Sequence, residues 1–219
     1  MSHHPSFDWH NAQEYVEGLL PEEVRRLEAE NRSGPGVPLQ PTIGPSVAQL
    51  VDVMILAHAP TRVLEIGTSV GYSAIAIARA LKRVGGQLIT IENDPRLARS
   101  AQQNLEEAGL DNVVEVLVED ANDTIQRFTE PFGLILQDGN KDDYLQMLPR
   151  LVDLLTPRGL LVTDDVLFPV MEVPDSARRW QFAMGLYNEA LQNRPELQTV
   201  WLPIGDGVAI SVKLPPAAP

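Results

Sequence analysis

The sequence predicts an α/β fold: a doubly wound, Rossmann-like sheet of seven strands with an antiparallel final hairpin strand, together with N-terminal helices. A chain of 219 residues has the length of one α/β domain. From residue 61 onward, strand-like and helix-like patterns alternate, and this favours a parallel sheet covered by helices. The last two strand-like runs, LQTVWLP and GVAISVKL, are joined by a short turn with Gly205 and Gly207. Such a turn makes a hairpin, so one edge strand must be antiparallel.

The expected elements follow in order along the chain. Residues 10–31 are acidic and amphipathic and precede Gly and Pro residues, which predicts one helix and then a loop. A second helix is expected at 46–58, before Pro60. We then expect strands at 62–66, 87–91, 113–118, 132–137 and 159–163, and helices at about 72–83, 95–108, 121–129, 141–155 and 176–193. The expected organisation is an N-terminal helix and loop extension at 1–40, one domain at 41–214 and a disordered tail at 215–219.

Composition restricts the classes of partner. Hydrophobic residues make up 44% of the chain, charged residues 21%, and no apolar run approaches the ~20 residues that span a bilayer. We therefore expect no membrane segment, and the first residues do not have the pattern of a signal peptide. The absence of cysteine excludes disulfides and thiolate ligands and fits a cytoplasmic protein. A formal net charge of -13 argues against binding to nucleic acid or to anionic membranes.

The stretch VLEIGTSVGYSAIAIARAL, residues 63–81, predicts a cofactor site. A strand carrying Glu65 leads into a turn with Gly67 and Gly71, and a helix with a polar start at Ser73 follows. This arrangement places free backbone N–H groups above the carboxyl edge of a sheet, where a nucleotide-like cofactor binds. The spacing G-x-x-x-G, in place of G-x-G-x-x-G, favours S-adenosylmethionine over a dinucleotide. Glu65 would anchor the amino group of its methionine part, or would be a strand-end charge facing solvent.

Two further strand ends carry acidic residues that suit a nucleoside. Glu92 ends the second strand, 21 residues after Gly71, where a carboxylate can accept both ribose hydroxyls. The alternative is a solvated residue at the end of the strand. Asp120 and Ala121 follow the third strand, where an adenine ring would lie. Asp120 also precedes a helix, so an N-cap is an equally good interpretation.

The fourth and fifth strands end in acidic segments that predict a cation site. LILQDGNKDDY places Asp138 and Lys141 at the carboxyl edge, and LLVTDDVLF brings Asp164 and Asp165 to the neighbouring tip. Adjacent strands lie ~4.8 Å apart, so three carboxylates can converge on one point. Hard oxygen ligands suit Mg²⁺, and a cation relieves the repulsion between them. Lys141 is placed as a base or charge partner; the alternatives are a helix-capping aspartate and a solvated lysine.

Together these motifs resemble the cation-dependent O-methyltransferases, the family that includes catechol and caffeoyl-CoA O-methyltransferases. The likeness runs from about residue 40 to 213 and covers VLEIGTSVGYS, IEND, QDGNKDDY, LLVTDDVLF and LPIGDGVAIS. The family fold is a seven-stranded sheet with a reversed last hairpin. The resemblance implies that the backbone around Gly67, Thr68, Gly71, Tyr72 and Ser73 holds the cofactor, with Glu65 at its amino acid end and Glu92 on the ribose. It implies metal ligands at Asp138 and Asp164, and it puts Lys141 beside the acceptor hydroxyl.

Three positions depart from the family pattern. Asp165 stands where the family usually has asparagine, and Glu119 stands where glycine is common. The segment FPVMEV replaces a tryptophan and a small-residue turn, so we expect Phe168 and its neighbours to shape a different acceptor pocket. Asp165 is still expected to complete the metal site with Asp138 and Asp164, and Asp138 is also assigned to the catalytic and cofactor-binding sets.

The sequence therefore predicts an S-adenosylmethionine-dependent O-methyltransferase that acts on a small catechol-like or phenolic acceptor with the help of a divalent cation, Mg²⁺. Family members commonly pair, so we expect a homodimer, with residues 10–31 or the helix of Trp180 in the contacts; Trp180 and Trp201 are otherwise expected in the core or an interface. Three alternatives stay open. They are a tRNA hydroxyuridine O-methyltransferase, a nicotinamide oxidoreductase, and a non-catalytic cofactor-binding relative with a decayed metal site.

Overall fold

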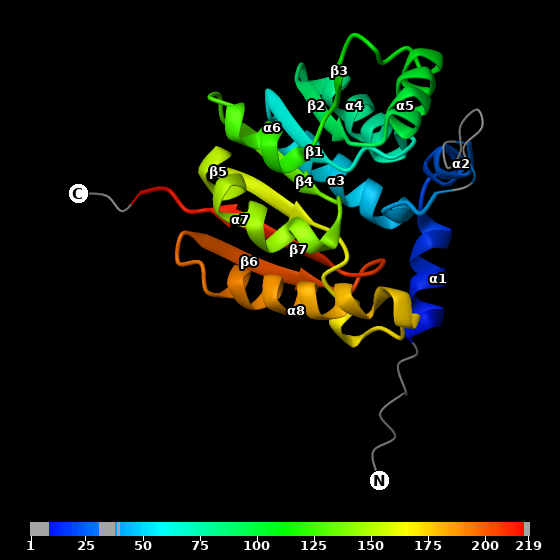
Figure 1. Cartoon of the computed structure of the whole chain (residues 1–219). Coiled ribbons are helices and arrows are strands. Elements are labelled where there is room, and N and C mark those ends of the chain that lie inside the picture. The colour runs from blue at the N-terminus through cyan, green and yellow to red at the C-terminus, as the bar shows by residue number, and fades with distance from the viewer. Residues whose placement is uncertain (1–8, 31–37, 39, 217–219) are drawn as a thin grey trace.

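The central feature of the fold is a seven-stranded sheet (Figure 1), seen in a computed structural model that describes residues 9–30, 38 and 40–216. The strand order is β3-β2-β1-β4-β5-β7-β6. The first five strands are parallel, whereas β7 is antiparallel to both β5 and β6. This confirms the predicted fold class. The strands are β1 (Arg62–Ile66), β2 (Gln87–Glu92), β3 (Val114–Val118), β4 (Phe132–Gln137), β5 (Leu155–Thr163), β6 (Leu197–Leu202) and β7 (Val208–Lys213).

Helices cover both faces of this sheet (Figure 1). Successive side chains of a strand point to opposite faces, so each strand feeds two cores. Val63 of β1 packs into a core with α3 and α4, and Leu64 packs into a core with α7 and α8. The helices are α1 (Trp9–Leu19), α2 (Glu22–Glu30), α3 (Gly44–His58), α4 (Tyr72–Val84), α5 (Pro95–Glu107), α6 (Ala121–Arg127), α7 (Tyr144–Leu154) and α8 (Arg178–Gln192), with 3-10 turns η1 (Lys141–Asp143), η2 (Phe168–Val170) and η3 (Asp175–Ala177).

Four of the expected elements differ from the structure. The single helix expected at 10–31 is two helices, because Pro21, which lacks an N–H, lies between α1 and α2. The helix expected at 141–155 begins as the turn η1 and ends at Leu154. Strand β5 begins at Leu155 instead of residue 159, with a shift of register against β4 before Leu160. The helix expected at 121–129 ends at Arg127.

Three parts of the expected organisation fall outside the described residues. These are the start of the N-terminal extension, at 1–8, most of the loop after α2, at 31–37 and 39, and the last part of the expected tail, at 217–219. Among the helices that the structure describes, none combines the length and the apolar character needed to cross a membrane.

The turn after β1 packs tightly against its neighbours, and this positions the site. Gly67 has φ +95°, and a Cβ there would lie 2.7 Å from the carbonyl carbon of Asp138. Gly71 has φ +92°, and a Cβ there would lie 3.2 Å from the backbone and side chain of Ala101 in α5. Only glycine combines this backbone conformation with such close approaches. The turn therefore lies directly beside the tip of β4.

Candidate active site

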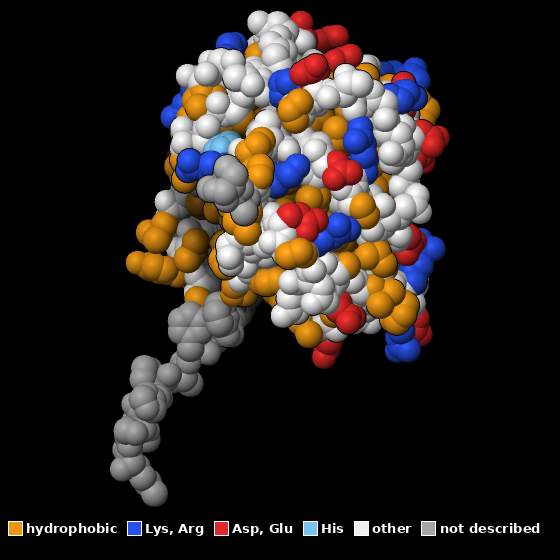
Figure 2. Space-filling model, turned by 90° about the vertical axis from the view of Figure 1, so that its left-hand side faces the viewer, with side chains coloured by type: hydrophobic (Ala, Val, Ile, Leu, Met, Phe, Trp, Pro, Cys, Tyr) orange, Lys and Arg blue, Asp and Glu red, His pale blue; other side chains and the backbone are white. Residues whose placement is uncertain are grey.

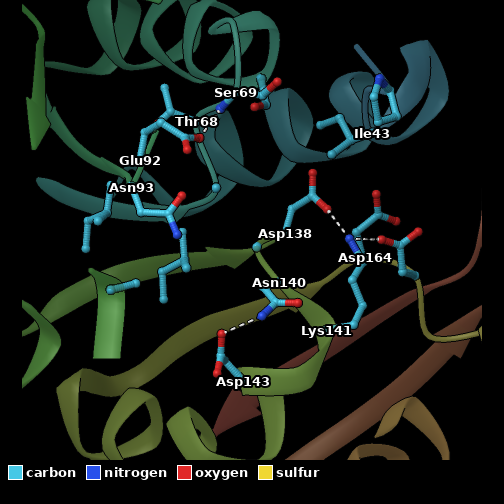
Figure 3. Close-up of a pocket in the computed structure, with 18 of the residues that line it drawn as sticks. Ile43, Thr68, Ser69, Glu92, Asn93, Asp138, Asn140, Lys141, Asp143 and Asp164 are labelled. Atoms are coloured by element: carbon cyan, nitrogen blue, oxygen red, sulfur yellow. Dashed lines mark hydrogen bonds and ion pairs between the residues drawn. The ribbon is translucent and has the colours of Figure 1, made fainter. Parts of the chain in front are cut away.

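A cavity of about 470 Å³ opens above the carboxyl ends of β1, β2, β4 and β5. Its walls include the turn after β1, the tips of these strands, η1, η2 and the start of α8, together with residues 41–43, residues 119–122 after β3 and the turn between β6 and β7. Figure 3 shows Thr68, Ser69 and Glu92 at one end and Asp138, Lys141 and Asp164 at the other. Of the thirteen residues that the sequence assigns to the catalytic, cofactor-binding and metal sets, eleven line the cavity and two, Glu65 and Gly71, do not. The eleven are Gly67, Thr68, Tyr72, Ser73, Glu92, Asp120, Ala121, Asp138, Lys141, Asp164 and Asp165.

Glu92 ties the turn after β1 to the tip of β2. Its Oε2 accepts a hydrogen bond from the backbone N–H of Ser69 at 2.8 Å, and its Oε1 accepts one from Asp94 at 2.9 Å. The side chain forms part of the cavity wall although the residue is buried. The carboxylate is thus fixed by backbone donors at the end of the cavity where a nucleoside is expected.

Glu65 lies behind the cavity wall instead of within it. The residue is fully buried, and its Oε2 accepts a hydrogen bond of 2.6 Å from the hydroxyl of Thr90. Burial raises the pKa of Glu65 to about 7, although the nearby hydroxyls of Ser73 and Thr90 lower it. Its Oε1 has no hydrogen-bond partner among the described residues. A buried carboxyl oxygen without a partner fits a cationic amino group that arrives with a cofactor.

The expected adenine end carries its own structural contacts. Asp120 caps α6, since its side chain accepts a hydrogen bond from the backbone N–H of Asn122 at 2.8 Å. Glu119, the departure from glycine, accepts a hydrogen bond from Thr124 at 2.7 Å and forms an ion pair with Arg127. These contacts hold Glu119 to α6, while both it and Asp120 line the cavity.

Three carboxylates converge at the other end of the cavity. One oxygen each from Asp138, Asp164 and Asp165 lies within 4.8 Å of the other two. Asp138 follows β4 and Asp164 follows β5, and these strands are parallel neighbours, as the sequence predicts. The Oδ1 atom of Asp164 is buried and has no hydrogen-bond partner in the part of the chain that the structure describes. Converging oxygens with one of them unpartnered are the donor set that fits Mg²⁺ or a similar hard cation.

Lys141 provides positive charge to this cluster. Its Nζ lies 3.4 Å from Oδ1 of Asp138 (Figure 3) and forms an ion pair with Asp165. Burial alone would lower the pKa of the Lys141 ammonium, but Asp138 and Asp165 outweigh it and raise that pKa. Burial raises the pKa of Asp138 to about 6 against the effect of Lys141, and it raises the pKa of Asp164 well above the usual range. Three carboxylates therefore share one ammonium at the site.

Among the residues of the cavity wall that were not predicted for the site are Trp180 and Asp206. Trp180, expected in the core or at an interface, lines the cavity and packs edge-to-face on Phe168, with ring centroids 6.3 Å apart. Asp206, in the turn between β6 and β7, also lines it, and its carbonyl accepts a hydrogen bond of 3.0 Å from Leu167. Burial raises the pKa of Asp206, and Asp165 adds to this. Asp206 lies in the motif LPIGDGVAIS, but no pattern in the sequence indicates that Trp180 faces a cavity.

Comparisons with known proteins agree with this geometry. The model of an O-methyltransferase family matches residues 16–214. The catechol O-methyltransferase of Niastella koreensis is 30% identical over 212 residues, which cover 90% of this chain and 94% of that protein.

Two solved structures share the fold along most of their length. A putative caffeoyl-CoA O-methyltransferase from Staphylococcus aureus is 26% identical, with a TM-score of 0.78 over 93% of this chain and 99% of its own. The O-methyltransferase TomG from Streptomyces achromogenes, solved in complex with SAM, is 26% identical, with a TM-score of 0.73 over 94% and 97%. The chain therefore belongs to this O-methyltransferase family, and it is an S-adenosylmethionine-dependent O-methyltransferase.

Proposed function

We propose that the enzyme methylates a hydroxyl of a small catechol-like or phenolic acceptor with the help of a divalent cation, Mg²⁺ in the simplest case. The observation that supports this most strongly is the convergence of Asp138, Asp164 and Asp165 within 4.8 Å, in the same cavity as the glycine turn. The names of the Niastella koreensis and Staphylococcus aureus relatives point to the same class of acceptor.

We assign cofactor binding to the residues at one end of the cavity and cation binding to those at the other. At one end, the turn from Gly67 to Ser73 would hold the cofactor, with Glu92 on the ribose, Glu65 toward the amino group and Asp120 and Ala121 toward the adenine. A cation held by Asp138, Asp164 and Asp165 would supply Lewis acidity that lowers the pKa of an acceptor hydroxyl. The chain then needs mainly to align the acceptor oxygen with the methyl carbon and the sulfur, which is an orientation effect.

We expect Lys141 to take part in removal of the hydroxyl proton. In the absence of a cation, Asp138 and Asp165 keep its ammonium charged. A cation that engages these carboxylates weakens their hold on Lys141 and brings its pKa toward that of a general base. The role of Lys141 is therefore coupled to the cation site.

The part of the cavity wall formed by Phe168 and Trp180 suits an aromatic acceptor. Phe168 and Trp180 present two rings in edge-to-face contact, a geometry that leaves apolar ring surface for a third aromatic group.

A small molecule fits the charge of the protein better than a nucleic acid. Figure 2 shows acidic and basic side chains interspersed on one face, and the net charge is -13. A polyanion would need a continuous basic surface.

The homodimer also belongs to this proposal. Tyr15 and Leu19 of α1 and Phe182 of α8 are 69%, 67% and 71% exposed. Large exposed apolar side chains of this kind are what a dimer interface buries. Light scattering at micromolar concentration should give the mass of a dimer, and a monomeric mass would contradict the proposal.

The cytoplasm is the proposed location, because a chain without cysteine needs no oxidising compartment.

A turnover screen tests the proposed acceptor class. Catechols, hydroxycinnamoyl thioesters and flavonoids are each offered with S-adenosylmethionine, in Mg²⁺ and in excess chelator. We expect turnover of at least one class in Mg²⁺ and its loss in Asp138→Asn. Asp142→Asn is the matched control, because Asp142 lies in the same turn but outside the cavity wall, paired with Arg179. Turnover of none of the three classes, or turnover that is equal in Mg²⁺ and in excess chelator, would contradict the proposal.

A further inference from the structure

A buried polar pair lies directly beneath the proposed cation site. Gln137 and Thr163 are the last residues of β4 and β5, and each immediately precedes an aspartate of the site. They are partners in the register of the two parallel strands, and both are fully buried. Polar side chains in such a position need hydrogen-bond partners from the interior of the protein.

Tyr187 of α8 supplies that partner to both side chains. Its hydroxyl lies 2.7 Å from Oγ1 of Thr163 and donates to Oε1 of Gln137 at 3.2 Å. Because a phenol has a single proton, the hydroxyl of Thr163 must be the donor in the first contact. Tyr187 is itself fully buried and packs edge-to-face on Tyr144, which donates to the carbonyl of Gln137 at 3.2 Å.

We propose that Tyr187 is a positioning residue for the cation site. Its hydroxyl joins the ends of β4 and β5 from below, and so fixes the spacing between Asp138 and Asp164. The backbone N–H of Asp164 donates to the carbonyl of Gln137 at 3.2 Å, so the two strand ends are also joined by the main chain at this level. This inference rests on the proposed function, since it assumes that the aspartates hold a cation.

The same contact links the cation site to the acceptor wall. Helix α8 carries both Tyr187 and Trp180, which lie seven residues apart and therefore about two helical turns along the same side. A movement of α8 at Trp180 would displace the hydroxyl of Tyr187, and with it the ends of β4 and β5 to which that hydroxyl is hydrogen-bonded.

Loss of the Tyr187 hydroxyl should make the positions of the site aspartates less fixed, while the aromatic ring still fills its place in the core. Thr163 and Oε1 of Gln137 would both lose a partner, and Nε2 of Gln137 already has none among the described residues. The side chain of Gln137 would then turn to find other partners and would shift the strand end that carries Asp138. Groups that orient metal ligands in this way typically account for about 10- to 100-fold in metal affinity.

The test is the affinity of the purified full chain for Mn²⁺ alone, measured by calorimetry or by the free-ion electron paramagnetic resonance signal. Tyr187→Phe and Thr163→Val remove the hydroxyls, whereas Thr163→Ser keeps one. Ser211→Ala is the matched control, because Ser211 is a fully buried hydroxyl that bridges β7 to Thr199 of β6 at 2.8 Å, away from the site. We expect Tyr187→Phe and Thr163→Val to weaken Mn²⁺ binding about tenfold. Thr163→Ser and Ser211→Ala should stay within about twofold of the wild type.

The outcomes separate this inference from the proposed function. A wild-type protein that takes up no Mn²⁺ overturns the cation site, and the inference with it. If the wild type binds Mn²⁺ and Tyr187→Phe binds it with the same affinity, the inference alone is overturned. An equal loss in Tyr187→Phe and Ser211→Ala also overturns it, because it shows only general destabilisation of the sheet. Should Tyr187→Phe fail to fold, the comparison of Thr163→Val with Thr163→Ser decides the question.

Discussion

Lys141 and Asp165 form an ion pair at the carboxylate end of the active-site cavity, where their side chains are only 16% and 10% exposed. Asp165 also has φ +66°, a left-handed conformation that asparagine and aspartate tolerate better than other non-glycine residues. One residue therefore satisfies a backbone requirement and adds a third negative charge to the proposed cation site. The departure from the asparagine of the family pattern affects charge far more than shape.

The first prediction concerns this added charge. Asp165→Asn should weaken Mg²⁺ binding several-fold, because a cation site loses affinity with each negative ligand removed. Turnover on a catechol at saturating Mg²⁺ should be kept or raised, since the third carboxylate offsets more of the cation's charge and so acidifies the acceptor hydroxyl less. Initial rates across an Mg²⁺ titration measure both effects. A loss of saturated turnover as large as that of Asp138→Ala would contradict this account.

The second prediction concerns Glu92. Glu92→Ala should weaken binding of S-adenosylhomocysteine by roughly 1.5–3 kcal/mol, the scale for hydrogen bonds to a charged group. The loss includes the two backbone donors, from Ser69 and Asp94, that Glu92 holds in place. Calorimetry measures the affinity. Glu115→Ala is the control, because it removes an exposed carboxylate from the neighbouring strand β3. Unchanged affinity in Glu92→Ala, or tight binding of NAD, would show that the site is assigned wrongly.

The third prediction separates chemistry from binding at Lys141. Lys141→Ala should lower turnover on the order of 10²-fold or more if the residue assists deprotonation. Affinity for S-adenosylhomocysteine should barely change, because the Lys141 amine lies at the carboxylate end of the cavity, next to Asp138 and Asp165. A methyl-transfer assay quenched at fixed times gives the turnover, and calorimetry on the same preparation gives the affinity for S-adenosylhomocysteine. Intact turnover would reduce Lys141 to a charge partner of the aspartates.

The fourth prediction is a pH dependence of folding caused by Glu65. Its pKa is about 7 in the folded protein, because the carboxyl is buried, against an ordinary value near 4.5. Between these pH values the folded protein keeps a proton that the unfolded chain loses. The contribution of Glu65 to the free energy of unfolding is therefore fully present below about pH 4.5 and is lost as the pH rises through 7, a change of roughly 2–4 kcal/mol.

Glu65→Gln should remove that part of the pH dependence. The amide stays neutral at every pH, while Asp138, whose pKa is also raised, is present in both proteins. Urea unfolding in the presence of chelator at pH 5 and pH 7.5 gives the comparison. The wild type should lose more free energy of unfolding between the two pH values than Glu65→Gln does. Equal slopes would mean that Glu65 is not held protonated by burial.

The sheet and most of the cavity follow from local patterns in the sequence. Buried strands that run into turns, and helices that begin after them, predict which residues reach the carboxyl edge. For this reason Gly67, Glu92, Asp138 and Asp164 could be placed from spacing alone. The break at Pro21 was missed because amphipathic periodicity continues across it, although proline cannot continue the hydrogen-bond ladder of the helix.

The missed parts of the site depend on contacts between distant segments. Trp180 lies on a helix whose burial pattern does not show which face meets a cavity. Asp206 reaches the site only because the antiparallel strand β7 lies next to β5, which brings the final turn beside Leu167. The position of Glu65 behind the wall depends on packing of the turn above it. These arrangements are set by tertiary structure, and neither propensity nor periodicity records them.

The most direct test of the account is enzyme activity against Mg²⁺ concentration after chelation, combined with a crystal soaked in Mn²⁺. A site built from Asp138, Asp164 and Asp165 predicts that activity on a catechol is lost in chelator and returns with Mg²⁺, and that the crystal shows one ion bound by these three carboxylates. Full activity in chelator, with no ion at the three aspartates in the soaked crystal, would contradict the cation site and indicate a methyltransferase that works without a metal.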